Sequence, residues 1–368
     1  MSGPVYIFAG GGTGGHLCPA VAVAEELTAL RPDARVVFAC SDRAIDRRVL
    51  SPHPYAIVAQ PVRPMPRGPA GWWRFGRSWR ASRRLARDLL RDLQPAAVLG
   101  LGGFAAAPVT VRAARAGIRT ALLSIDAVPG IANRLLARKV LVIFAQYART
   151  AQAYGKCAKK VRVVGPLVRR ELLAGDPSEA RAAFGLRADR RTLLVMAGSQ
   201  GAANVNRAVA ALTADLGSLA DSWQVLHVAG PEKLDEVREQ WAGAAIGHAV
   251  VGFCDRMDLA FAAADLALCR GGASTAGELA ATGTPAVVMP YPYHRDRQQY
   301  LNVAEAAEAG AVEVVEDRTD PAANAVLLRA SLLAIMADPS RLEAMSQAAA
   351  GRVRADAAAE IARWMAGP

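Results

Sequence analysis

Short apolar runs alternate along the chain with longer segments in which apolar residues recur every three or four positions. A run of the first kind is typical of a buried strand, and a segment of the second kind is typical of a helix. In the first half we predict a helix at Pro19–Leu30 and strands at Val5–Ala9, Arg35–Ala39, Leu99, Ala121–Ser124 and Val140–Ala145. Strands that alternate with helices form a parallel sheet with both faces covered, so this half is predicted to be an α/β domain.

The same pattern starts again after a short strand at Val161–Val164. A charged helical connector is predicted at Leu172–Arg187. Further strands are predicted at Arg191–Ala197, Val225–Val228, Ala249–Val251, Leu266–Cys269 and Ala286–Met289, and an Ala-rich helix at Arg341–Met365 closes the chain. We therefore expect two doubly wound domains, residues 1–165 and 166–345, and a closing helix at 346–368. Such domains bind ligands beyond the carboxyl ends of their strands, and facing domains would place those ends across one cleft.

The length of 368 residues fits two domains. No run of about 18 apolar residues is uninterrupted, and the N-terminus lacks the basic region of a signal peptide, so we expect a soluble or surface-bound cytoplasmic protein. The five cysteines are an odd number and contain no C-x-x-C pair. A disulfide framework or a zinc site is therefore not expected. No Asp-x-Asp triplet appears in the sequence, so the pattern does not require a tightly held metal.

Positive charge is concentrated in the first half of the chain. Residues 1–168 contain 25 basic and 8 acidic side chains, whereas residues 169–368 contain 19 and 25. The most basic segment, Pro61–Leu93, contains the aromatic residues Trp72, Trp73, Phe75 and Trp79 among arginines that include Arg80. This mixture is typical of an anionic membrane interface. A nucleic-acid stacking surface or a plain solvated helix would have the same composition.

The first strand ends in a glycine-rich loop, residues 10–15, that leads into a helix. Such a loop lets backbone N–H groups and the helix N-terminus approach an anion. Its spacing also fits the dinucleotide-binding pattern, with Asp42 placed as the acid for the ribose, so an NAD-dependent dehydrogenase is one alternative. His16 follows the loop, where an imidazole is suited to take or give a proton near neutral pH. The other interpretation is that His16 only caps the turn.

Two loops of the second half have the residue types that a nucleotide sugar needs. Residues Cys269–Leu279 join a buried strand to a helix through two glycines, and the N–H groups of the first turn would hold a diphosphate. Glu278, one turn further, would accept the hydroxyl groups of a ribose, unless it only balances the helix dipole. After the next strand, Asp296, Gln298 and Gln299 offer donors and acceptors to sugar hydroxyls, although a helix cap alone would explain Asp296.

Together these motifs resemble those of the MurG family. The similarity rests on Gly-Gly-Thr-Gly-Gly-His at 11–16, Gly102-Gly103-Phe104, Gly198-Ser199-Gln200-Gly201, the 272–278 turn and Asp296-Arg297-Gln298-Gln299-Tyr300, in order over nearly the whole chain. The resemblance implies an inverting hexosyltransferase of the GT-B fold, with two facing Rossmann-like domains and no cofactor. Its expected reaction moves N-acetylglucosamine from UDP-N-acetylglucosamine to the C4 hydroxyl of the MurNAc in lipid I, giving lipid II for peptidoglycan synthesis.

The resemblance also implies which residues contact the donor. These are Thr13, Gly14, Gly15, Asp126, Arg169, Ser199, Cys254, Gly272, Ala273, Ser274, Thr275, Ala276, Gly277, Glu278, Gln298 and Gln299. The chain departs from the family at Ser124-Ile125-Asp126, where Glu-Gln-Asn is usual, and at Gly165-Pro166-Leu167, where the usual Asn is missing. We predict that His16 is the general base for the acceptor hydroxyl, with Asp126 as a second candidate.

A lipid-linked acceptor favours the membrane interpretation of the basic segment over nucleic acid. We therefore expect a peripheral protein at the cytoplasmic face of the inner membrane, held by an anionic surface through Trp72, Trp73, Phe75, Trp79 and Arg80. Two alternatives remain open for the function. One is a related glycosyltransferase for another lipid or a natural product, and the other is a non-catalytic protein that binds sugar nucleotides.

Overall fold

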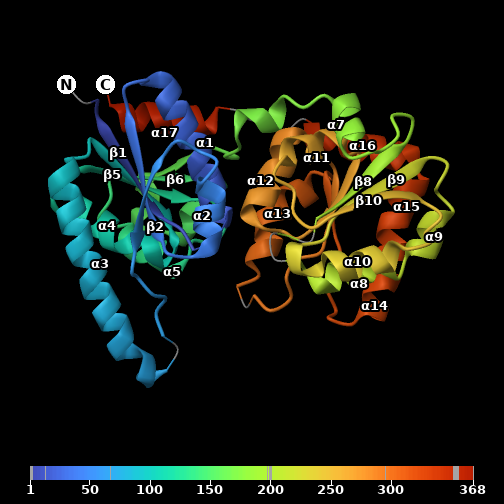
Figure 1. Ribbon diagram of the computed structural model, residues 1–368, viewed down its shortest axis with the longest axis horizontal. Coiled ribbons are helices and arrows are strands. Elements are labelled where there is room, and N and C mark those ends of the chain that lie inside the picture. The colour runs from blue at the N-terminus through green and yellow to red at the C-terminus, as the bar shows by residue number, and fades with distance from the viewer. Residues whose placement is uncertain are drawn as a thin grey trace. The chain divides into compact units, whose positions relative to one another are not determined.

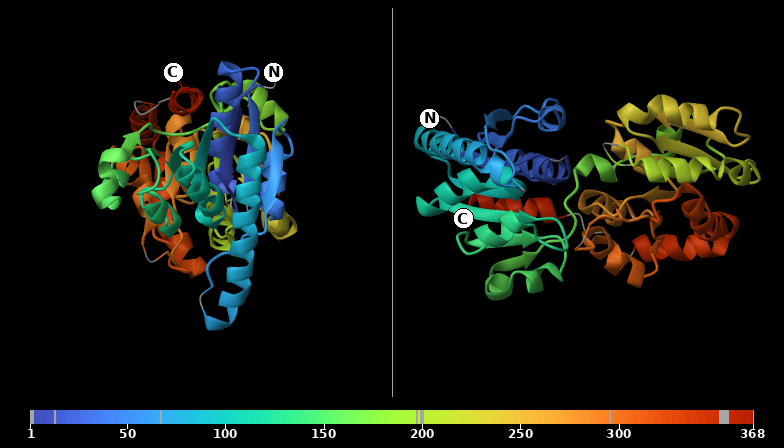
Figure 2. Two further views of the ribbon diagram at one scale, coloured as in Figure 1. Left: turned by 90° about the vertical axis from the view of Figure 1, so that its left-hand side faces the viewer. Right: turned by 90° about the horizontal axis from the view of Figure 1, so that it is seen from below.

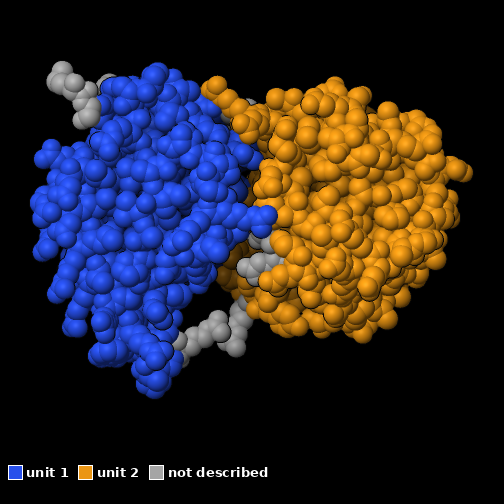
Figure 3. All heavy atoms as spheres, viewed as in Figure 1, with its two compact units in different colours: residues 1–169, 355–368 blue, residues 170–354 orange. Residues whose placement is uncertain are grey.

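The structure is a computed structural model that describes residues 3–12, 14–66, 68–196, 198, 201–294, 296–350 and 356–367. The chain forms two compact units (Figure 3). Unit 1 contains residues 1–169 and 355–368, and unit 2 contains residues 170–354. Each unit is built around one parallel sheet with helices packed on it (Figure 1). The predicted class, two doubly wound α/β domains, is confirmed.

Unit 1 contains a seven-stranded sheet with the strand order β3-β2-β1-β4-β5-β6-β7. The strands are β1 (Val5–Gly10), β2 (Arg35–Ser41), β3 (Ala56–Gln60), β4 (Ala97–Gly102), β5 (Arg119–Ser124), β6 (Val142–Ala145) and β7 (Val161–Val163). Every residue of the central strands β1 and β4 is buried, as expected for a parallel sheet covered on both faces. The sequence did not predict β3 because it is an edge strand with only one buried residue.

Helices cover both faces of this sheet. They are α1 (Gly14–Leu30), α2 (Ala44–Leu50), α3 (Trp72–Leu93), α4 (Gly103–Arg115), α5 (Ile131–Leu136), α6 (Thr150–Ala153) and α17 (Ala357–Ala366). The strand order reverses between β1 and β4, and right-handed crossovers therefore put α1 and α2 on one face and α3, α4 and α5 on the other. The contacts agree, because α1 packs against α2 and α17 whereas α4 packs against α3 and α5. The N-terminal half of α3 extends past the body of unit 1 (Figures 1 and 2).

Unit 2 contains a six-stranded sheet with the order β10-β9-β8-β11-β12-β13. The strands are β8 (Arg191–Met196), β9 (Trp223–Val228), β10 (Gly247–Val251), β11 (Leu266–Cys269), β12 (Ala286–Val288) and β13 (Val312–Val314). The helices are α7 (Pro177–Ala183), α8 (Ala203–Ala210), α9 (Thr213–Gly217), α10 (Leu234–Trp241), α11 (Met257–Ala263), α12 (Ala273–Thr282), α13 (Gln298–Glu308), α14 (Pro321–Leu328), α15 (Ala334–Ala337) and α16 (Pro339–Ala350).

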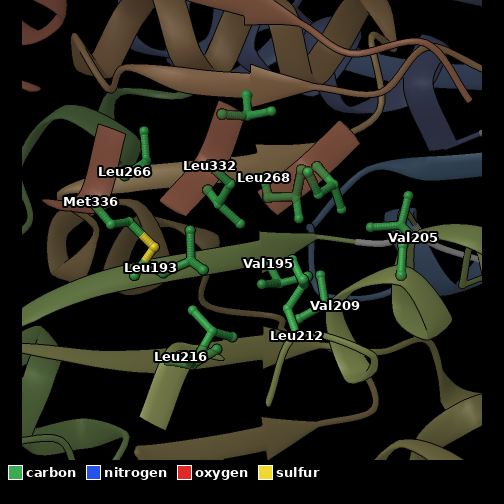
Figure 4. Close-up of a cluster of buried hydrophobic side chains, with 14 of the residues drawn as sticks. Leu193, Val195, Val205, Val209, Leu212, Leu216, Leu266, Leu268, Leu332 and Met336 are labelled. Carbon is green, nitrogen blue, oxygen red and sulfur yellow. The ribbon is translucent and has the colours of Figure 1, made fainter. Parts of the chain in front are cut away.

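The main core of unit 2 lies between its sheet and the helices around it. Leu193 and Val195 of β8 pack there with Val209 of α8 and with Leu332 and Met336 (Figure 4). The segments Pro321–Ala337 and Pro339–Ala350, which help to form this core, together have the length and apolar composition of a membrane span, but a 92° bend separates them. Among the described helices, no single one is both long and apolar enough to cross a bilayer.

Two sequence predictions about helices are wrong. The connector predicted at Leu172–Arg187 is interrupted, because Asp176 accepts hydrogen bonds from the N–H groups of Ser178 and Glu179 and so begins a new helix, α7. The closing helix predicted at 346–368 is two helices that belong to different units. Helix α16 ends at Ala350 in unit 2, whereas α17 packs against α1 and β4 in unit 1.

Candidate active site

A buried carboxylate holds the first glycine loop in place. Gly10, the last residue of β1, and the next two residues, Gly11 and Gly12, have φ of 155°, 143° and 92°, a region that favours glycine. The N–H of Gly12 donates to both carboxylate oxygens of Asp46, at 2.8 and 2.9 Å. Asp46 also accepts from the backbone N–H and the hydroxyl of Ser41, at 3.0 and 2.6 Å. The loop therefore has a fixed shape in which one of its donors is already paired with a negative charge.

This pairing argues against the dehydrogenase alternative. A dinucleotide site needs the N–H groups of the loop for its pyrophosphate, but the N–H of Gly12 already donates to Asp46. A pyrophosphate there would also be repelled by the Asp46 charge. Asp42, the acid expected to bind the ribose, is exposed. The sequence missed Asp46 because it lies 34 residues from Gly12 and belongs to no motif.

His16 lies in the first turn of α1, beside the loop that follows β4. A Cβ atom on Gly102 would come within 3.3 Å of the His16 ring and 3.2 Å of the Asn133 side-chain oxygen, so the three residues are close neighbours. Asn133 is held by its amide, which donates to the carbonyl of Leu123 at 3.0 Å. Burial lowers the pKa of His16, while the charges of Asp126 and Asp46 act in the opposite direction. The neutral form that a general base needs is therefore favoured near neutral pH.

The two predicted base candidates are near enough to interact. Asp126 follows β5, and its charge acts to raise the pKa of His16 against the larger, opposite effect of burial. The Ser124 and Asn133 side chains lie near the buried Tyr154, and burial raises the pKa of Tyr154 to about 12. No sequence motif pointed to Tyr154. Gly14 and Gly15 also lie at the start of α1, whereas Thr13 is outside the described residues.

In unit 2, helix α12 begins directly after β11 with the geometry that the sequence predicted. Gly272 is the N-cap residue and, as a glycine, makes no side-chain cap hydrogen bond. The first turn contains Ala273, Ser274, Thr275 and Ala276, and Gly277 is buried in the second turn. Its N–H groups and the helix dipole favour an anion at this end. Glu278 lies one turn further, partly exposed, and together with burial it raises the pKa of the Cys269 thiol to about 12.

A buried ion pair supports this end of the sheet. Arg270 binds Asp317 at 2.8 Å, and the two side chains are 12% and 0% exposed. Arg270 also donates to the carbonyl oxygens of Met289 and Pro290, at 2.9 and 3.2 Å. Asp317 accepts further hydrogen bonds from Asn204, Asn324 and the N–H of Thr319. These hydrogen bonds to Asp317 hold its pKa below the usual value, against the effect of burial.

The loop after β12 is fixed against the same helix start. Gly271 has no room for a side chain, since a Cβ atom there would lie 2.3 Å from the carbonyl oxygen of Gln299. Asn302 of α13 donates to the carbonyl of Gly271 at 3.1 Å. The side-chain oxygen of Gln299 accepts from the N–H of Tyr291 at 2.8 Å, and Asp296 accepts from the N–H of Gln298 at 3.2 Å. The N-cap residue of α13 is Arg297, which makes no side-chain cap hydrogen bond, so the prediction that Asp296 is the cap residue is wrong. Asp296 lies one position before the cap. The start of α13 lies beside the start of α12.

The remaining predicted donor contacts belong to segments other than the loops that precede α12 and α13. Cys254 lies after β10, and burial raises its pKa to about 11. Arg169 ends the first of the two segments that form unit 1, and it is partly exposed. Ser199 is outside the described residues. Among the described residues, no group of three or more His, Cys, Asp or Glu side chains has the arrangement of a metal site. The donor roles of all these residues stay predictions.

Known proteins share both the sequence and the fold. The N-terminal domain model of glycosyltransferase family 28 matches residues 6–145, and the C-terminal domain model matches residues 192–361. Curated relatives from Mycobacterium bovis and Clavibacter michiganensis are each 37% identical, over 97% of this chain and over 87% and 95% of their own lengths. Both are named UDP-N-acetylglucosamine--N-acetylmuramyl-(pentapeptide) pyrophosphoryl-undecaprenol N-acetylglucosamine transferase. The crystal structure of Acinetobacter baumannii MurG has the same fold, with a TM-score of 0.75, 22% identity and full coverage of both chains.

The protein is a glycosyltransferase that transfers a hexose. This class follows from its two parallel-sheet units, which have the GT-B architecture, and from the two domain models that match them. The identity to curated relatives over nearly the full length is specific to one group of these enzymes. The chain belongs to the MurG family of N-acetylglucosamine transferases, within glycosyltransferase family 28. The resemblance stated from the sequence motifs is therefore confirmed.

Proposed function

We propose that this enzyme transfers N-acetylglucosamine from UDP-N-acetylglucosamine to the C4 hydroxyl of the MurNAc in lipid I, forming lipid II for peptidoglycan synthesis. The names of the curated relatives support this donor and this acceptor. The observation that supports it most strongly in the structure is the start of α12, where a helix N-terminus with Gly272 as its N-cap residue is followed by Glu278 and backed by the buried Arg270–Asp317 pair.

The donor binds in unit 2 through complementary charges. Its diphosphate lies at the first turn of α12, where N–H groups and the helix dipole stabilise negative charge. The Glu278 carboxylate accepts the two ribose hydroxyls, and Gln298 and Gln299 contact the sugar. Arg270 keeps the carbonyls of Met289 and Pro290 in place, so the α12 and α13 loops keep a shape that fits one ligand. This preorganisation lowers the cost of stabilising charge during the reaction.

The reaction is a direct displacement at the anomeric carbon. The acceptor hydroxyl oxygen forms a bond to that carbon while the bond from the carbon to the UDP oxygen breaks, so the configuration inverts. The acceptor proton goes to the neutral His16 imidazole, which burial keeps unprotonated near pH 7. The electron pair of the broken bond stays on UDP, and the added negative charge is stabilised by the start of α12. Asp126 stabilises the imidazolium that forms.

The decisive experiment measures transfer of radiolabelled sugar from several UDP-sugars to a lipid I analogue. We expect transfer from UDP-N-acetylglucosamine with a large preference over UDP-glucose. His16→Ala should lower turnover by about 10²–10⁴ and leave UDP affinity nearly unchanged. Glu278→Gln should instead weaken UDP binding, because the ribose hydroxyls lose the charged acceptor.

A preference for another sugar, or transfer only to a different acceptor, would assign the chain to a related glycosyltransferase. UDP binding without any transfer would make it a non-catalytic sugar-nucleotide binder. Unchanged turnover in His16→Ala would remove this residue from the role of base.

The basic segment supports a second part of the proposal, that the enzyme is a peripheral protein at the cytoplasmic face of the inner membrane. Trp72 and Trp73 begin α3 and are 50% and 72% exposed. This end of α3 extends past the body of unit 1 (Figure 2), and large exposed aromatic side chains of this kind are stabilised at a bilayer interface.

Co-sedimentation with anionic liposomes tests this docking. Trp72→Ser/Trp73→Ser should weaken the binding. Leu30→Ser, a change at another exposed apolar side chain of unit 1, should not. No binding of the native enzyme at low salt would contradict the proposal.

A further inference from the structure

Three aromatic side chains form an exposed cluster on the loop between β12 and α13. The Tyr291 ring lies 5.3 Å from the Tyr293 ring and 4.9 Å from the His294 ring, measured between ring centroids. Tyr291 and Tyr293 are 40% and 66% exposed. We call these three side chains the aromatic cluster. Its rings contact one another edge to face, a geometry that aromatic pairs favour.

The two tyrosines differ from the other exposed apolar side chains of unit 2. Among the residues that the structure describes, four large apolar side chains of this unit are exposed. Leu173 lies before α7 and Val326 lies on α14, so these two belong to different elements. Single exposed apolar residues are normal, whereas neighbouring ones mark binding surfaces. Tyrosine is also common in binding surfaces, because its large ring ends in a polar hydroxyl.

Polar contacts fix the backbone of the aromatic cluster. The N–H of Tyr291 donates to the side-chain oxygen of Gln299 at 2.8 Å. Arg270 donates to the carbonyl of Pro290 at 3.2 Å, and its guanidinium lies 6.0 Å from the centre of the Tyr291 ring. Arg270 is itself held by the buried Asp317. A surface that is ordered before its ligand arrives loses less entropy on binding.

The aromatic cluster adjoins the proposed sugar contacts. Gln299, which the proposed function places at the donor sugar, is the residue that binds the Tyr291 N–H. During transfer, the acceptor hydroxyl must come within about 3–3.5 Å of the anomeric carbon. Groups of the acceptor beside that hydroxyl are therefore brought near this loop. In MurNAc, the lactyl group that carries the peptide is bonded to O3, next to the C4 hydroxyl, so the peptide is such a group.

The shape of the aromatic cluster favours the peptide over a sugar ring. A pyranose stacks on one flat aromatic face, but the Tyr293 and His294 rings are inclined to the Tyr291 ring by 66° and 69°. A short peptide, with flat amide groups and small apolar side chains, can follow such an uneven surface. Among the described residues, neither tyrosine hydroxyl has a hydrogen-bond partner, so both can donate to peptide carbonyl groups.

We propose that the aromatic cluster is a subsite for the peptide of the acceptor, and that Tyr293, the more exposed of its two tyrosines, makes the main contact. The inference rests on the proposed function and adds an acceptor contact in unit 2. The native enzyme should therefore have a lower KM for an acceptor with the peptide than for one without it.

The test measures transfer to two water-soluble lipid I analogues, one with the pentapeptide and one that ends at the lactyl group. Tyr293→Ser removes one aromatic contact, so the KM for the peptide acceptor should rise about two- to tenfold. The KM for the peptide-free acceptor and the KM for the donor should stay unchanged. The control Val326→Ser, at a side chain of unit 2 that is 61% exposed, should change none of the three constants.

A second variant separates the ring from its hydroxyl. Tyr293→Phe keeps the ring, so its effect on the KM for the peptide acceptor should be clearly smaller than that of Tyr293→Ser. An effect of the same size would show that the ring contributes nothing to binding and would overturn the proposal.

The other outcomes distinguish the subsite from the reaction. Equal rises in KM for both acceptors would assign the aromatic cluster to the sugar ring and overturn the peptide subsite, as would no change in either constant. Native transfer that does not depend on the peptide would overturn the subsite alone. Failure of the native enzyme to transfer to either analogue would overturn the proposed function as well.

Discussion

Asp317→Asn tests whether the buried ion pair behind α12 supports the candidate donor site. The substitution keeps the shape of the side chain but removes its charge, which leaves Arg270 buried without a counter-charge. It also replaces one of two acceptor oxygens that together serve Arg270, Asn204, Asn324 and the Thr319 N–H.

The expected cost follows from burial. Removing one partner of a buried ion pair costs about 3–5 kcal/mol, and Asp317 is fully buried. We expect Asp317→Asn to lower the free energy of unfolding by about 3 kcal/mol. Asp189→Asn is the matched control, since Asp189 pairs with Arg187 at 2.7 Å on the surface of the same unit. That exposed pair should contribute little to stability, because solvent screens its attraction.

Urea denaturation followed by tryptophan fluorescence measures both changes, since Trp223 and Trp241 are buried in unit 2. The pKa of Asp317 is lowered in the folded state, so its carboxylate stabilises the fold above the unfolded pKa of about 3.9. The difference between native and variant should be constant above about pH 5 and should shrink as the pH falls toward the lowered pKa. A loss no larger than that of Asp189→Asn, or a difference that does not depend on pH, would refute the reasoning.

Three further predictions follow from the candidate site. Burial lowers the pKa of His16 below its ordinary 6.5, so on the acid side of the pH profile kcat/KM should fall only below that pH. Asp126→Asn removes the charge that raises this pKa, so the fall in kcat/KM should begin at a still lower pH. A fall that begins at a higher pH in this variant would contradict the electrostatic role of Asp126. Gly271→Ala should destabilise the protein and raise the KM for the donor, because the new Cβ would lie 2.3 Å from the backbone oxygen of Gln299. The control Gly272→Ala should leave the melting temperature unchanged, because its Cβ would meet only the Thr275 hydroxyl, at 3.9 Å. Asp46→Asn should cost about 1–3 kcal/mol in unfolding free energy because it removes a paired acceptor from a buried network, while the exposed Asp42→Asn should stay within about 0.5 kcal/mol; similar values for the two would show that Asp46 does not hold the glycine loop.

The fold class and the positions of the main loops could be predicted from the sequence because they depend on local patterns. Parallel strands buried on both faces appear as apolar runs, as in β1 and β4. The start of α12 was also predictable, since two glycines after a buried strand determine where the helix begins. The predictions failed where no local pattern exists. Strand β3 at the sheet edge has one buried residue, and α17 belongs to unit 1 only because of its packing on α1.

The sequence by itself therefore determined the two α/β units, the glycine loops and the candidate residues His16 and Glu278, because each follows from neighbours in the chain. Only the tertiary structure decided how these residues are supported. It brought Asp46 to Gly12 and Asp317 to Arg270, and it placed Asn133 beside the His16 ring. The physical reason is that a buried polar group needs partners. Both the burial of such a group and the position of its hydrogen-bond partner depend on packing between segments that lie far apart in the sequence.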